Sequence, residues 1–115
     1  PTGVRLVVGH RGGRLELWRS SVDNAVSLPL SELRARLFAT LLAAGPDADV
    51  LAERLVAAIW GRGALRTRLD VNQLVHRTRR ALALVGFDGA AILVRHPAGG
   101  ATAIHLAKGA TVEIR

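Results

Sequence analysis

The chain has no cysteine, methionine or tyrosine, and only 3% of its 115 residues are aromatic. The lack of cysteine excludes disulfides and thiolate metal sites and is compatible with a reducing compartment. With so few aromatic side chains, the protein has no row of platforms on which single-stranded nucleic acid would stack. No apolar run approaches the ~20 residues that a membrane-spanning helix requires. We therefore expect a cytoplasmic protein that makes no contact with a membrane.

Features typical of enzymes are also missing. The glycine turns Arg11–Gly13 and Gly61–Gly63 lack the pattern of a phosphate-binding loop. The carboxylates are scattered, and no Ser/His/Asp arrangement can be argued. Four histidines are present without the spacing of a metal site: His10, His76, His96 and His105. We expect no catalytic activity, no cofactor and no metal.

Negative charge is scarce as well. Fifteen Arg and one Lys oppose nine carboxylates, which gives a formal net charge of +7. Between Trp60 and Leu82, six Arg face Asp70 alone. Such an excess favours a polyanionic partner. An Ala- and Arg-rich composition also arises from GC-rich codons, so charge alone leaves the partner open.

The length and the hydrophobic content predict one folded domain. Half of the residues are hydrophobic and are interleaved with charge, which is enough for a single core. No internal repeat and no low-complexity segment interrupts the chain. Because it begins at Pro1 without Met, we expect residues 1–115 to be a single domain excised from a longer regulator.

Residues 1–30 predict a small antiparallel sheet. Val4–His10 and Arg14–Arg19 are rich in β-forming residues and are joined by a short glycine-containing loop, which is typical of a hairpin. Ala25–Leu30 is expected to add a third strand. Residues 87–115 predict a second hairpin, with strands Ala91–Arg95 and Ala101–Leu106, and a terminal strand at Val112–Ile114.

Between these sheets, residues 31–86 predict three helices. The first runs from about Ser31 to Ala44, with an apolar stripe at Leu30, Leu33, Leu37 and Leu41. The second is expected to begin at a cap supplied by Asp47 or Asp49 and to end at Gly61. Its expected buried stripe consists of Leu51, Leu55, Ala58 and Ile59.

The third helix has the clearest pattern. Thr67 and Asp70 stand at the spacing of a capping box, and Gly86 is expected to end the helix. One face is predicted to be core and consists of Val71, Val75, Thr78 and Leu82. The opposite face is almost entirely polar, and it includes Gln73, His76, Arg77 and Arg80, with Asn72 and Arg79 at its margins.

These motifs, in this order, resemble the winged-helix DNA-binding domain of OmpR/PhoB-type transcriptional regulators. They are also similar to the N-terminal domain of Streptomyces antibiotic regulatory proteins. The matching pieces are Ser31–Arg34, the LVAAIWG run at Leu55–Gly61, the HRTRRAL run at His76–Leu82, and the hairpin Ala91–Leu106. The resemblance covers nearly the whole chain and implies an α+β winged helix-turn-helix fold.

The resemblance also implies double-stranded DNA as the partner, with recognition-helix contacts at His76, Arg77 and Arg79. From their chemistry, Arg77 and Arg80 are suited to phosphates or to guanine, and Asn72 and Gln73 to adenine. The remaining candidates lie in the link before the helix and in the hairpin: Arg66, Arg68, Arg95, His96 and Lys108. The family further suggests RNA polymerase contact and homodimers on direct repeats.

One alternative remains open at this point. A winged helix can serve as an adaptor domain of a signalling or defence protein and bind a protein instead of DNA. Two departures from the family pattern favour this alternative. Thr78 stands where the family has a core leucine. The predicted C-terminal hairpin corresponds to the family's wing, and its segment Gly99–Thr102 lacks the aromatic residue found there in the family.

Overall fold

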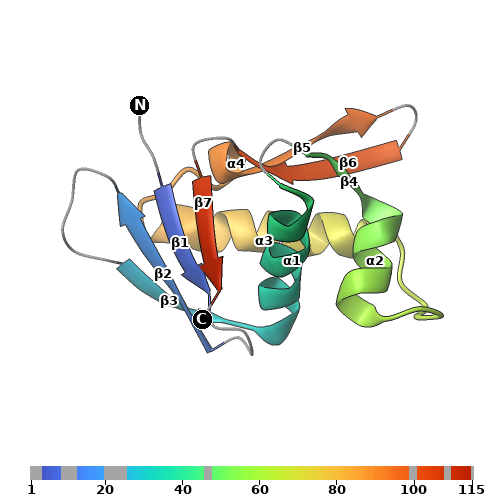
Figure 1. Cartoon of the computed structure of the whole chain (residues 1–115), viewed down its shortest axis with the longest axis horizontal. Coiled ribbons are helices and arrows are strands. Elements are labelled where there is room, and N and C mark those ends of the chain that lie inside the picture. Colours follow the sequence, from blue (N-terminus) through green and yellow to red (C-terminus); the bar gives the residue numbers. More distant parts are fainter. Residues whose placement is uncertain are drawn as a thin grey trace.

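The computed structural model is an α+β fold (Figure 1). It describes residues 4–8, 13–19, 26–45, 48–98, 101–107 and 110–114. None of the helices in these ranges combines the length and apolar character needed to cross a bilayer. The elements in chain order are β1 (Val4–Val8), β2 (Gly13–Arg19), β3 (Val26–Leu30), α1 (Glu32–Ala44), β4 (Val50–Leu51), α2 (Ala52–Trp60), α3 (Arg68–Leu84), α4 (Gly89–Ile92), β5 (Leu93–Ala98), β6 (Ala101–Leu106) and β7 (Ala110–Ile114).

The N-terminal sheet has four strands in the order β3-β2-β1-β7. Strands β1 and β2 form the predicted antiparallel hairpin, and β3 pairs with β2 antiparallel as expected. The terminal strand β7 lies parallel to β1, with Leu6 opposite Val112. The last strand therefore belongs to the N-terminal sheet and lies beside the first strand, which the sequence pattern does not reveal (Figure 1).

The second sheet has three strands in the order β4-β6-β5. The predicted C-terminal hairpin is confirmed as β5 and β6, but two of its boundary residues are corrected. Ala91 and Ile92 are helical, because the Asp88 carboxylate accepts the Ala91 N–H at 3.2 Å and starts the short helix α4. The two-residue strand β4, absent from the sequence prediction, pairs with β6 and joins the hairpin to the segment between α1 and α2.

Helix α1 buries a stripe that differs slightly from the predicted one. Leu37 and Leu41 are fully buried as expected, whereas Leu33 is 36% exposed and Ala35 is buried instead. Ser31 caps the helix by accepting the Arg34 N–H. On the outer side, the Arg36 guanidinium donates to the Ile59 carbonyl at 2.7 Å and thereby ties α1 to the last turn of α2.

Helix α2 begins later than the sequence suggests. Its N-cap is Leu51, whose side chain makes no capping hydrogen bond, and Leu51 is 39% exposed. The prediction that Asp49 caps this helix is wrong, because its carboxylate is used by two histidines; Asp47 lies outside the described residues. The stripe that faces the core is Ala52, Leu55 and Ile59, and the expected Ala58 is exposed.

Helix α3 follows its predicted pattern closely. Its four buried residues are Val71, Val75, Thr78 and Leu82. The Thr78 hydroxyl donates to the Leu74 carbonyl at 2.7 Å, so this buried polar group is satisfied within the helix. At the C-terminus Gly86 adopts φ 88°, and the Phe87 N–H bonds to the Leu82 carbonyl in a Schellman arrangement.

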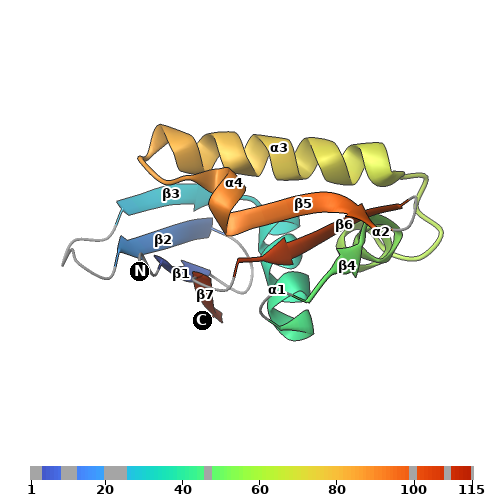
Figure 2. The ribbon, with the colours of Figure 1, turned by 90° about the horizontal axis from the view of Figure 1, so that it is seen from above.

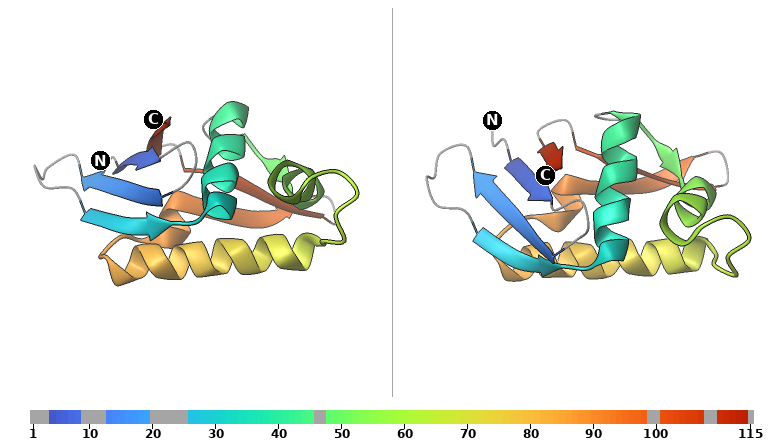
Figure 3. Two further views of the ribbon diagram at one scale, coloured as in Figure 1. Left: turned by 90° about the horizontal axis from the view of Figure 1, so that it is seen from below. Right: turned by 60° about the horizontal axis from the view of Figure 1, so that its bottom comes forward.

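Helix α3 runs along one side of the molecule, as Figure 2 shows. The two views in Figure 3 agree, since the other helices and strands lie to one side of this helix. Its core-facing residues pack against the main hydrophobic cluster, which includes Leu37, Phe38 and Leu55. The face turned away from that cluster is therefore left to solvent along much of the helix.

The start of α3 is held by the predicted capping box. The Thr67 side chain accepts the Leu69 N–H at 3.2 Å, and the Asp70 carboxylate accepts the Thr67 N–H at 2.8 Å. This backbone N–H, with Arg66 nearby, holds the pKa of Asp70 below its ordinary value. The hydrogen bond from the Thr67 N–H to the Asp70 carboxylate is therefore present at neutral pH. Its contribution to the free energy of unfolding is lost as the pH falls through the lowered pKa of Asp70.

We expect Thr67→Ala to lower the free energy of unfolding by about 1 kcal/mol, because one N-terminal N–H of α3 loses its acceptor. Urea denaturation followed by circular dichroism measures this loss. Thr67→Ser is the matched control, because it keeps the hydroxyl and should retain most of the stability. Equal destabilisation by the two substitutions would show that the hydroxyl is not the stabilising group.

Candidate nucleic-acid interface

The outer face of α3 carries a cationic surface. The helix turns its four buried residues toward the core, and the helical period places Gln73, His76, Arg77 and Arg80 on the other side. All four of these side chains are exposed, as is Arg68 in the first turn. The positively charged groups predicted for this face therefore lie at the surface and are not packed inside the molecule.

Arg66 lies in the link before α3 and is partly held in place. Its guanidinium lies 3.5 Å from the Asp70 carboxylate and 5.6 Å from the centre of the Trp60 ring. The side chain is still 51% exposed. The link thus positions one more cation beside the N-terminus of α3. The half-buried Trp60 contacts the Arg66 guanidinium through its ring and also packs against the hydrophobic core.

The family resemblance predicts that Arg79 contacts DNA from the recognition helix, but the structure gives this residue a contact inside the fold. Its guanidinium donates through Nε and Nη2 to the Leu93 carbonyl, at 2.8 and 2.5 Å. Partial burial lowers the pKa of Arg79, and the nearby Arg95 lowers it further. Arg79 therefore joins α3 to the start of β5, and we leave it out of the proposed interface.

Asn72 is also poorly placed for the predicted role. Its Oδ1 atom is buried and has no hydrogen-bond partner among the residues that the structure describes. Reading adenine requires the amide oxygen and the amide nitrogen of one side chain together. Of the two amides predicted to contact adenine, only Gln73 is exposed.

The hairpin directs two of the predicted DNA-contact residues to opposite faces of the sheet. Arg95 and His96 are neighbours in β5, so their side chains point to opposite faces of the sheet. Arg95 is exposed on the face nearer α3, since it lies close enough to Arg79 to affect that residue's pKa. His96 points to the other face. Lys108, the third candidate in this region, lies outside the described residues.

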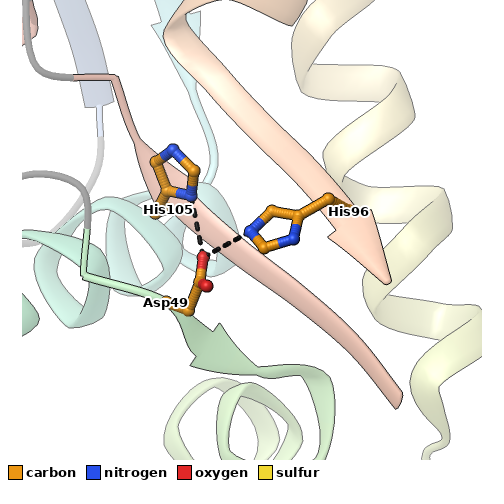
Figure 4. Close-up of side chains that lie close together, drawn as sticks. All are labelled: Asp49, His96 and His105. Atoms are coloured by element: carbon orange, nitrogen blue, oxygen red, sulfur yellow. Dashed lines mark hydrogen bonds and ion pairs between the residues drawn. The ribbon is translucent and has the colours of Figure 1, made fainter. Parts of the chain in front are cut away.

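On that other face the structure assembles a group that the sequence does not suggest. His96 on β5 and His105 on β6 both contact the Asp49 carboxylate just before β4 (Figure 4). The His96 Nε2–Asp49 Oδ1 distance is 2.7 Å, and the His105 Nδ1–Asp49 Oδ1 distance is 2.8 Å. Hydrogen bonds from His105 and His96 lower the pKa of Asp49, and the hydrogen bond to Asp49 is the main cause that raises the pKa of His96.

Comparison of this chain with protein-family models, curated proteins and solved structures finds no match. Its function is therefore inferred from the positions of its own residues. Two surfaces stand out among those described. One is the cationic face of α3 with its flanking arginines, and the other is the histidine–carboxylate cluster between β4, β5 and β6.

Proposed function

We propose that this chain is a winged-helix domain that binds double-stranded DNA, acting as the effector domain of a bacterial transcription regulator. The observation that carries the proposal is the exposed row His76, Arg77 and Arg80 on a helix whose opposite face is fully buried. A helix of this kind, held rigidly by its core face and presenting donors outward, suits the major groove.

Each part of the surface has a distinct task in the proposal. Arg77 and Arg80 offer planar guanidinium groups to phosphates or, for one of them, to guanine O6 and N7. Gln73 lies nearer the N-terminus of α3, the end that approaches base edges when a recognition helix docks. Arg66 and Arg68 are placed to contact the phosphate backbone beside that end.

The rest of the fold supports the same proposal. Helix α2 is followed by a short link, with Gly61 and Gly63 at positive φ, and then by α3. In the proposal, α2 and α3 are the two helices of a helix-turn-helix. The β5–β6 hairpin lies beside α3 and is joined to it through Arg79 and Leu93. In the proposal the hairpin is the wing, and Arg95 contacts the adjacent backbone. The resemblance to OmpR/PhoB-type regulators adds polymerase contact and dimers on direct repeats as proposed partners.

A specific observation supports the adaptor alternative as a second candidate. Leu69 and Leu84 lie on the outer side of α3 and are 68% and 88% exposed, and Leu65 in the link is fully exposed. Large apolar side chains at these positions are suited to contact with a protein. In this alternative the arginines among them would pair with carboxylates of the partner.

Salt dependence tests the proposed function. Five exposed arginines (Arg66, Arg68, Arg77, Arg80 and Arg95) are placed to neutralise phosphates. If all five do so, log K for DNA falls against log[salt] with a slope of about −4 to −5. Fluorescence anisotropy with duplexes chosen by binding-site selection measures this slope. Absence of DNA retention at low salt, together with a salt-insensitive protein complex, would overturn DNA binding in favour of the adaptor.

A further inference from the structure

The cluster of Asp49, His96 and His105 offers three ligand atoms at one point on the surface. The Asp49 carboxylate oxygen, His96 Nε2 and His105 Nδ1 all lie within 4.8 Å of one another. Asp49 is 47 residues from His96 and 56 residues from His105 in the chain. The three residues meet only because β4, β5 and β6 form one sheet. Figure 4 shows both rings directed at the same carboxylate oxygen.

The sheet register explains the meeting. His105 is opposite Val94 in the β5–β6 pair, so His96 is its diagonal neighbour on the same face. In the β4–β6 pair Val50 is opposite Ile104, which brings Asp49, one residue earlier, next to His105. The ring centroids of the two histidines are 5.5 Å apart. The pairing of the three strands therefore brings these side chains together on one face of the sheet.

The contacts of His96 make the cluster more than a chance ion pair. Its Nδ1 atom is 3.1 Å from the Pro97 carbonyl oxygen, and its Nε2 atom is 2.7 Å from Asp49 Oδ1. Both partners are hydrogen-bond acceptors, while a neutral imidazole has only one N–H. A ring with one proton can donate to only one of these two partners, and the lone pair of its other nitrogen then faces an acceptor oxygen. Both contacts are favourable when the ring carries two protons, or when Nδ1–H donates to Pro97 and a metal cation lies between Nε2 and the Asp49 carboxylate.

We propose that Asp49, His96 and His105 form a binding site for a zinc ion. Two imidazole nitrogens and one carboxylate oxygen are a ligand set that zinc accepts, and a fourth position remains for water. The Nδ1 contact of His96 with the Pro97 carbonyl is the outer hydrogen bond that orients a ligating imidazole. Magnesium and calcium are disfavoured, because the cluster supplies only one carboxylate.

Zinc binding requires a rearrangement of the side chains but not of the backbone pairing. In a tetrahedral zinc site, ligand atoms about 2 Å from the metal are roughly 3.3 Å apart. The two His–Asp distances of 2.7 and 2.8 Å would lengthen by about half an ångström to reach that separation. The His96 Nε2 and His105 Nδ1 atoms, which lie within 4.8 Å of each other, would have to come to the same separation. The side chains of His96 and Asp49 are each 40% exposed, so both have room to move and the ion has access from solvent. Bound zinc would link β4 to both strands of the hairpin.

Isothermal titration of the whole chain, without an affinity tag, with zinc chloride at pH 7.5 tests this proposal. We expect one zinc ion per chain in the wild type. The double variant H96Q/H105Q should bind zinc roughly 100-fold more weakly or not at all. The matched control H10Q/H76Q removes the other two histidines and should bind as the wild type does. Asp49→Asn, which keeps the side chain's shape, should also lose affinity.

Two readouts do not depend on the variants folding. On addition of zinc, the ring signals of two histidines should shift in NMR spectra, while that of the exposed His76 stays in place. Zinc at 100 times its Kd should raise Tm by roughly 10 °C. Magnesium should do neither. Zinc binding no tighter in the wild type than in H96Q/H105Q, or shifts confined to His76, would overturn the proposal. Because no readout uses DNA, failure here would leave the proposed function untouched.

Discussion

Replacing Arg77 and Arg80 together by alanine is expected to abolish most DNA binding while the fold stays intact. Both side chains are exposed and lie on the side of α3 opposite its buried residues, so we expect their removal to leave the core unchanged. Each guanidinium that contacts a phosphate adds about one to the salt slope. A guanidinium that contacts a guanine contributes more to the affinity and to the sequence specificity. We expect affinity to fall roughly 100-fold at moderate salt and the slope to become shallower by about 2.

The double variant must be compared with one that loses the same charge elsewhere. Arg5→Ala with Arg14→Ala removes two positive charges from strands β1 and β2 of the N-terminal sheet. This control reports how much binding comes from net charge alone. Anisotropy titrations over a range of salt concentrations, with circular dichroism to verify folding, give both slopes. If the two variants lose affinity equally, α3 is not the recognition element and the basic composition alone attracts DNA.

Features that depend on nearby residues could be predicted from the sequence. Thr67 and Asp70 are three residues apart, and the helical period alone places Val71, Val75, Thr78 and Leu82 on one face. The predicted hairpins share this property, because each joins two β-rich runs across a short glycine-containing loop. In all these cases the partners are close in the chain and the pattern repeats several times. The exposed face of α3 follows directly from its buried one.

Features that depend on distant partners could not be predicted. Strand β4 is only two residues long and exists because β6 offers an edge to it. Whether Asp49 caps α2 or contacts two histidines depends on the register between β4 and β6, and no periodicity encodes that register. The same holds for Arg79, whose guanidinium donates to the carbonyl of Leu93, 14 residues further along the chain. A surface arginine and one with an internal bond look alike in sequence.

Gly89→Ala is expected to cause a large loss of stability. Gly89 is buried in the first turn of α4, where that helix packs against α3. A Cβ atom at this position would lie 2.5 Å from the Cα atom and from the carbonyl oxygen of Arg79. These are backbone atoms in the middle of α3, so they cannot swing away as the end of a flexible side chain would.

The clash must therefore be relieved by moving α4, and the hairpin moves with it, because β5 begins directly after α4. Overpacking of this kind costs about 1–3 kcal/mol or more, which lowers Tm by roughly 5–15 °C. The shift would also strain the Arg79–Leu93 hydrogen bonds that hold the hairpin beside α3. Thermal denaturation measures the loss, and Ala90→Ser, at the exposed neighbouring position, is the matched control. If both variants melt at the same temperature, α4 does not pack against α3 as closely as this contact requires.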